Sequence, residues 1–146
     1  MAGTPVKNAG IVMMIGAVAG ALPTVPISGL ADIPEFGNER KALDVTDLSN
    51  HWRRYLKGLK DGGKLSLSGQ FRGDDRGQQL LWAATNSEAS YMFSVELPDT
   101  KGTNGSKYQF LAQVLSTKVV PGKVDGLVEF KSDLQIDQSV TLTAAA

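Results

Sequence analysis

Few side chains in this sequence could carry out catalysis or hold a metal ion. His51 is the only histidine and cysteine is absent, so neither a multi-histidine site nor a thiolate metal site can form. A Ser-His-Asp triad would have to use His51, and no serine lies in the strand-turn-helix context of a nucleophile elbow. We therefore interpret His51 as a loop residue packed beside Trp52, and we expect no catalytic residue, no metal and no cofactor.

The acidic residues are better explained by structure than by chemistry. The adjacent pair Asp74 and Asp75 could act as paired carboxylates or as cation ligands, but a role as the N-cap of a helix accounts for both. Glu39, Asp44 and Asp47 do not have the spacing of a calcium-binding loop. These carboxylates therefore give no evidence for an active site.

One cluster of basic and aromatic side chains has the composition of a nucleic-acid-binding patch. Its members are Trp52, Arg53, Arg54, Tyr55, Lys57 and Lys60. Nearby Asp44, Asp47 and Asp61 neutralise much of its charge. The whole chain has 15 basic and 15 acidic residues, so it lacks the net positive charge that drives ordinary DNA binding by counterion release. We expect this cluster to be a solvated surface or a contact between subunits.

The elements that could position such residues are clearest between residues 62 and 99. Apolar and polar residues alternate there in two segments, which is the pattern of half-buried strands. The expected inward positions are Leu65, Leu67, Gly69 and Phe71, and then Tyr91, Phe93, Val95 and Leu97. Between the two strands, Asp74 or Asp75 can cap a short helix whose apolar stripe includes Leu80, with Trp82 at its edge.

The apolar run from Ile11 to Leu22 could be an export signal, a membrane span or a strand. It is too short to span a bilayer, and only Lys7 supplies the positive charge that precedes a signal sequence. We expect a first strand over Ile11–Ala19, apolar on both faces and covered on both sides. A second strand is expected over residues 27–36, interrupted by Pro34.

The stretch from Gly37 to Gly63 has no clean period and is predicted to be a long irregular loop with one helical turn capped by Ser49. A connection of this length is uncommon inside a compact domain and is usually functional or disordered. Trp52, Tyr55 and Leu56 favour burial over disorder. We therefore expect the loop to pack on an adjacent subunit.

Antiparallel strands account for the rest of the chain. We expect a hairpin loop over residues 99–107, a strand that begins near Tyr108, a turn at Pro121 and a strand over residues 127–136. In that strand, Val128, Phe130, Leu134 and Ile136 should face inward, and Glu129, Lys131, Asp133 and Gln135 outward. The sequence therefore predicts one mainly β domain over residues 1–146: an antiparallel β-sandwich or partly closed barrel with one short flanking α-helix and the long irregular loop.

The order of these elements resembles the tail tube (major tail) proteins of long-tailed bacteriophages and gene-transfer particles. The matching pieces are the apolar first strand, Ile33–Phe36, the long loop, Leu65–Phe71, Gly77–Leu81 and Lys118–Leu134. The resemblance covers essentially the whole chain and rests on element order and composition.

This resemblance implies a structural, non-enzymatic protein of the virion tail, assembled in the host cytoplasm. Proteins of this family form six-membered rings that stack into a hollow tube through which DNA passes into the host. The implied partners are further copies of the chain, a tape measure protein inside the tube, and tail tip and neck proteins at its ends. Genome DNA would be in transit only, without specific nucleic-acid binding, and no membrane would be involved.

Two surface assignments follow for a tube subunit. Ring closure needs two different, complementary surfaces on each subunit, and the candidates for contacts between subunits or rings are Trp52, Arg53, Arg54, Tyr55 and Lys57. The wall of the lumen should be neutral to acidic so that DNA slides past it. The candidates for lumen-facing residues are Glu129, Lys131 and Asp133, on a polar strand face.

A competing hypothesis is a binding module whose loops 37–63 and 99–107 grip a carbohydrate or a receptor, as adhesin or phage fibre domains do. An enzyme with a jelly-roll fold is disfavoured by the lone His51. The tube subunit and the binding module differ in the expected assembly state of the purified protein. A tube subunit should form rings or concentration-dependent polymers, whereas a binding module should stay monomeric or form a small closed oligomer.

Overall fold

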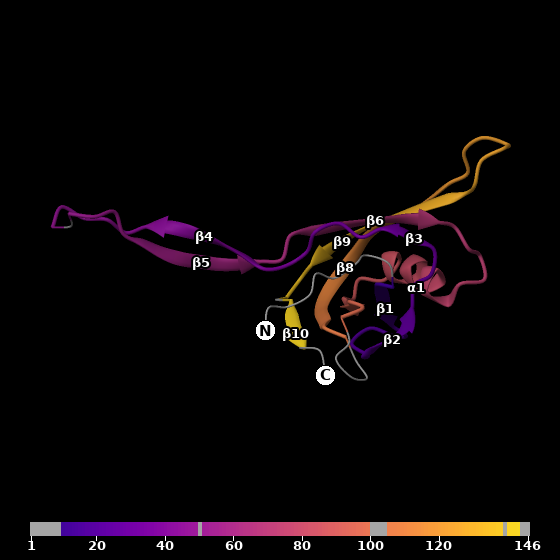
Figure 1. The fold of residues 1–146 in the computed structure, drawn as a ribbon, viewed down its shortest axis with the longest axis horizontal. Helices are drawn as coiled ribbons and strands as arrows, with labels where there is room; N and C mark the ends of the chain where they lie inside the picture. The colour runs from indigo at the N-terminus through magenta and orange to yellow at the C-terminus, as the bar shows by residue number, and fades with distance from the viewer. Residues whose placement is uncertain (1–9, 50, 100–104, 139, 144–146) are drawn as a thin grey trace.

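Eight strands form one curved antiparallel sheet in this computed structural model (Figure 1). The structure describes residues 10–49, 51–99, 105–138 and 140–143, so most of the expected loop 99–107 lies outside the described residues. The strands of the sheet are β1 (Val12–Gly16), β2 (Pro23–Pro26), β3 (Leu30–Asp32), β6 (Lys64–Gln70), β7 (Tyr91–Glu96), β8 (Lys107–Val120), β9 (Glu129–Ile136) and β10 (Thr141–Thr143). Their order is β2-β1-β7-β8-β9-β6-β3, and β10 pairs with the start of β8.

The two edge strands of the sheet are β2 and β3. They are consecutive in the sequence but do not pair with each other. The short link between them is anchored to both sides of the gap. Ile27 N donates to Met13 O at 2.8 Å, and Gln70 N donates to Gly29 O at 2.8 Å. The predicted class, mainly β with antiparallel strands and one short helix, is therefore confirmed, and the sheet is open instead of a closed barrel.

The helix α1 (Arg76–Thr85) packs on the concave side of the sheet (Figure 1). Asp75 is its N-cap, because its carboxylate accepts hydrogen bonds from Gln78 N at 3.0 Å and from Ser28 N at 3.1 Å. This confirms the capped helix predicted at Asp74 or Asp75. The predicted apolar stripe is buried, and Trp82 is left half-exposed at the edge of the helix.

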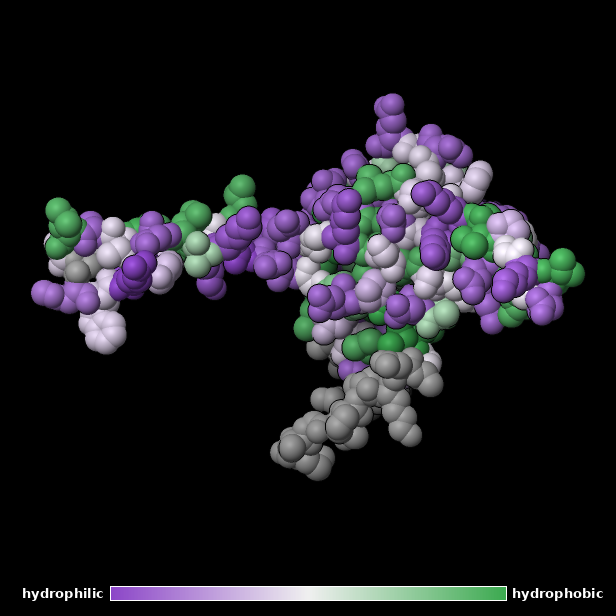
Figure 2. Space-filling view, turned by 90° about the horizontal axis from the view of Figure 1, so that it is seen from above, coloured by the Kyte–Doolittle hydropathy of each residue, from purple (hydrophilic) through white to green (hydrophobic). Residues whose placement is uncertain are grey.

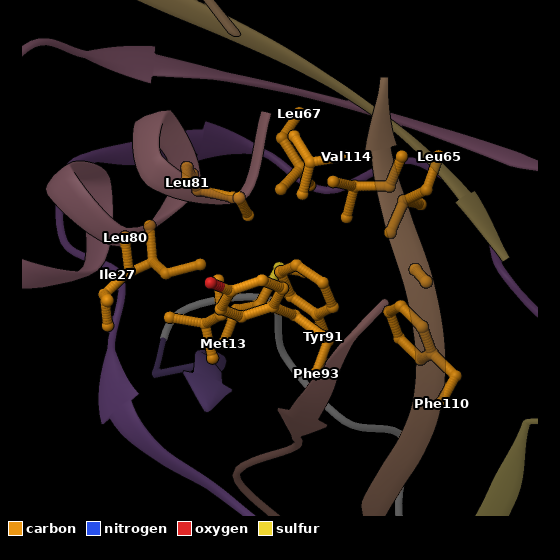
Figure 3. Packing of buried hydrophobic residues seen from close by; sticks show 14 of the residues in the cluster. Met13, Ile27, Leu65, Leu67, Leu80, Leu81, Tyr91, Phe93, Phe110 and Val114 are labelled. Atoms are coloured by element: carbon orange, nitrogen blue, oxygen red, sulfur yellow. The ribbon is translucent and has the colours of Figure 1, made fainter. Parts of the chain in front are cut away.

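The hydrophobic core lies between α1 and the sheet (Figure 3). The inward positions predicted from alternation are mostly buried: Leu65, Leu67, Tyr91, Phe93, Val95, Phe130, Leu134 and Ile136. The rings of Phe93 and Phe110 stack with their centroids 5.8 Å apart. Phe71 and Val128 were also expected inside but are exposed, because β6 ends before Phe71 and β9 begins after Val128.

Two predictions about the N-terminal strands are wrong. The expected strand over residues 11–19, apolar on both faces, is the shorter β1, which lies between β2 and β7 inside the sheet. Its residues alternate, since Met13 and Ile15 are buried whereas Val12 is exposed. The expected strand over residues 27–36 is replaced by two short strands, with β2 before this segment and β3 within it.

The segment predicted to be a long irregular loop is mainly a two-stranded antiparallel ribbon. Its strands are β4 (Glu39–Asp44) and β5 (Tyr55–Asp61), and the ribbon extends away from the sheet (Figure 1). The described residues around Ser49 do not form the expected helical turn. Instead, Asp47 Oδ1 accepts from Ser49 N at 2.9 Å in a tight turn. The sequence shows no alternation of apolar and polar residues here, because a ribbon with both faces in solvent has no buried face to impose it.

The side chain of Gln78 joins α1 to the link between β2 and β3 and to the end of β6. Its Oε1 accepts from Arg72 N at 2.9 Å, and its Nε2 donates to Ser28 O at 2.8 Å and to Gln70 O at 2.9 Å. Gln78 is buried. Together with Asp75, which accepts from Ser28 N, this amide holds α1 against the link between β2 and β3.

Gln78→Ala should lower the free energy of unfolding by about 2–3 kcal/mol, because three backbone groups lose their hydrogen-bond partner. The matched control is Gln79→Ala, which removes one exposed hydrogen bond to Gly73 O and should cost less than about 1 kcal/mol. Urea unfolding followed by circular dichroism measures both values. Equal losses in the two variants would contradict the bridging role of Gln78.

Candidate assembly surfaces

The ribbon formed by β4 and β5 exposes almost all of its side chains to solvent. These include large apolar residues: Leu43, Val45, Leu48, Trp52, Tyr55, Leu56 and Leu59. Trp52 is 84% exposed and Leu59 is 93% exposed. Figure 2 shows hydrophobic side chains along the ribbon, set among hydrophilic ones. Exposed apolar surface of this extent is typical of an interaction site.

The tip of the ribbon is ordered by its own hydrogen bonds. Asp44 Oδ1 accepts from Thr46 N at 2.9 Å, and this hydrogen bond lowers the pKa of Asp44 from its ordinary value. Thr46 Oγ1 accepts from Arg54 N at 2.7 Å. Arg53 lies 3.6 Å from Asp44 in an exposed ion pair, a type that contributes little to stability. These contacts join the two sides of the ribbon next to Trp52.

The structure brings the predicted contact residues together in the outer half of this ribbon. Trp52, Arg53 and Arg54 lie in the turn region, and Tyr55 and Lys57 lie on β5. His51 is exposed, and its packing beside Trp52 stays a prediction. Sequence reasoning missed Leu43, Leu48 and Leu59 as members of the same apolar surface. In the sequence, these three leucines are marked only as aliphatic residues in a segment without an alternating pattern.

The three candidates for the lumen lie together on the outer face of β9. Glu129, Lys131 and Asp133 are all exposed, on the side of the sheet opposite the core. Asp133 accepts from Ser116 Oγ at 3.2 Å, and Lys131 lies across from Lys118 on β8. This face therefore carries charges of both signs.

A second exposed surface lies at the end of β8 and β9, which project as a hairpin beyond the helix (Figure 1). Its exposed apolar residues are Val119, Val120, Val124, Leu127 and Val128. A groove of about 340 Å³ opens between this hairpin and α1. The groove could not be predicted from the sequence, because its lining comes from segments that are far apart in the chain.

Neither a metal centre nor a membrane-spanning helix is found in the described ranges. No group of three or more His, Asp or Glu residues there could hold a metal ion. No helix in the same ranges has the length and apolar character needed to cross a membrane.

Solved structures with this fold include chains of a gene transfer agent particle, the SPP1 tail tube and the anti-feeding prophage. A chain in the tail of an empty gene transfer agent (GTA) particle is 20% identical, with a TM-score of 0.72 over 94% of this chain and 98% of that one. The SPP1 tail tube is 15% identical, with a TM-score of 0.71 over 96% and 80%. The cap that terminates the tube of the anti-feeding prophage is 11% identical, with a TM-score of 0.75 over 99% and 95%.

No protein-family model and no curated protein matches the sequence. The likeness to the solved structures shows the fold, and it spans nearly the whole chain. The resemblance predicted from the order of the elements is therefore confirmed at the level of the fold.

Proposed function

We propose that this chain is a structural, non-enzymatic subunit of a phage or gene-transfer-particle tail, and that its copies form six-membered rings stacked into a hollow tube. The observation that carries this proposal is the exposed apolar ribbon, on a fold shared with chains of a GTA tail and of the SPP1 tail tube. The GTA tail was refined with C6 symmetry, which supports rings of six.

The subunit has two different ends, as a tube of stacked copies requires. The ribbon extends from one end of the body, and α1 and the β8–β9 hairpin lie at the other end (Figure 1). Contacts between two different surfaces continue from copy to copy, as closed rings or as open filaments. The edge strands β2 and β3 also leave unpaired backbone groups that a neighbouring copy could use.

In this tube the outer face of β9, with Glu129, Lys131 and Asp133, lines the lumen. The basic residues Arg53 and Arg54 then lie at contacts between subunits or rings, away from DNA in transit. The further partners are a tape measure protein inside the tube and tail tip and neck proteins at its ends. The assembled protein resides in the virion tail and binds neither a specific nucleic-acid sequence nor a membrane.

A second candidate function is that of a cap that ends a tube. The similarity to the anti-feeding prophage cap, which covers 99% of this chain, favours it. The two functions differ in assembly, because a tube subunit stacks without limit whereas a cap forms a single ring. Sedimentation of the purified protein at increasing concentration tests the proposal: large polymers support a tube, a single ring supports a cap, and a monomer contradicts both.

Arg53→Glu combined with Arg54→Glu should block polymerisation, because the reversed charges would repel the acidic groups expected on the neighbour. Higher ionic strength should weaken the polymers of the unmodified chain for the same reason. The matched control is Lys118→Glu with Lys131→Glu, an equal charge change on the sheet face. Light scattering measures both variants. Normal assembly of the arginine variant with altered DNA retention would place the arginines in the channel.

A further inference from the structure

The groove between α1 and the β8–β9 hairpin is apolar and open at the surface. Its lining includes Phe71, Trp82, Val119 and Phe130. The side chains of Phe71, Trp82 and Val119 are 43%, 53% and 42% exposed. Such high exposure is unusual for large apolar side chains that lie close together. The volume of about 340 Å³ is at the small end of the range for binding pockets, so it suits one large side chain better than a whole strand.

The walls of this groove are fixed by hydrogen bonds. Gln78 holds the backbone of Arg72 on one side. On the other side, Thr85 Oγ1 at the end of α1 lies 2.7 Å from Thr117 Oγ1 on β8, which lies 3.2 Å from Ser132 Oγ on β9. The groove is therefore formed before a partner arrives, which lowers the cost of binding.

We infer that this groove receives the ribbon tip of a second copy of the chain, with Trp52 as the side chain that enters it. The inference rests on the proposed function, and it names the surface on which the ribbon docks. Trp52 is almost fully exposed, in the turn region of the ribbon. Figure 1 shows that the ribbon extends away from the end of the body that carries α1, so a chain cannot fill its own groove.

A charged contact is also available to this occupant. Arg53 and Arg54 follow Trp52 directly, and the exposed carboxylate of Asp74 is next to Gly73 in the groove wall, which also contains Arg72. An arginine beside the face of Trp82 would add a cation–π contact. An indole placed among Phe71, Trp82 and Val119, with one guanidinium group beside Asp74, would contact both the apolar lining and the carboxylate at its edge.

Disulfide trapping tests this contact, since the chain has no cysteine of its own. His51→Cys places a thiol beside Trp52 without removing the indole, and Gln79→Cys places one in the groove wall. A disulfide forms only when the two Cα atoms come within about 7 Å. Mixing and oxidising the two single variants should give a cross-linked pair. The matched control replaces Gln79→Cys with Gln113→Cys, an exposed position on β8 that is not in the groove.

The expected result is a cross-link with Gln79→Cys at several times the yield obtained with Gln113→Cys. Adding Trp52→Ala to the His51→Cys chain should abolish this difference, and Trp52→Phe should largely retain it. Equal yields at both positions, in a protein that still polymerises, would overturn the docking site and leave the proposed function intact. A chain that does not associate at any concentration would overturn the proposed function itself.

Discussion

Phe130→Asp should leave the chain unfolded at neutral pH. The ring of Phe130 is 2% exposed, on the inner face of β9, where it belongs to the cluster of buried hydrophobic residues. Losing the ring costs about 3–5 kcal/mol, and burying an unpaired charge adds several more. The sum is comparable to the whole stability of a domain of this size, about 5–15 kcal/mol.

The neighbouring substitution Lys131→Glu is the control, because its side chain lies on the exposed face of the same strand. It should change the free energy of unfolding by less than about 0.5 kcal/mol. Circular dichroism and heat denaturation of both variants provide the comparison. Similar losses of stability would mean that both faces of β9 are buried, and the assignment of its outer face to a solvent-filled lumen would fail.

Excision of the ribbon should abolish polymerisation and leave the monomer folded. The excised chain would join Arg40 to Lys60, which lie opposite each other in the ribbon, through an Asn-Gly turn suited to a two-residue hairpin. No described side chain of the removed segment is buried, so the core is left intact. The assembly would lose Trp52 and the exposed leucines, each worth about 2–3 kcal/mol when fully buried.

Trp52→Ala is the minimal form of the same experiment and should weaken polymerisation strongly without changing the unfolding transition. Sedimentation velocity reports the assembly, and urea unfolding reports the fold. An excised chain that still polymerises would show that the ribbon is not an assembly surface. A chain that unfolds after excision would instead place the ribbon within the folding unit.

The sequence was informative wherever an element has one face in the core and one in solvent. The strands β6, β7 and β9 and the capped helix α1 follow from alternation and from Asp75, since burial on one side imposes the pattern. The ribbon could not be predicted in this way, because none of its faces is buried within the chain. The strand β1 was predicted too long because small apolar residues continue past Gly16, where the strand ends.

The candidate surfaces were predictable to different degrees. Trp52 and its basic neighbours stood out because large aromatic residues had no predicted element to bury them. The groove could not be found in the sequence, since Phe71, Trp82 and Val119 meet only after α1 packs on the sheet. Phe71 in particular continued the alternation of β6 and was therefore assigned to the core, although its strand ends one residue earlier.

The most direct test of the proposed tube is electron microscopy of the purified, unmodified chain over a range of concentrations. The account predicts hollow tubes of uniform diameter whose cross-section has six-fold symmetry, with the polar face of β9 turned toward the central channel. A folded protein that remains monomeric at its highest soluble concentration, with no rings or tubes in the images, would contradict it.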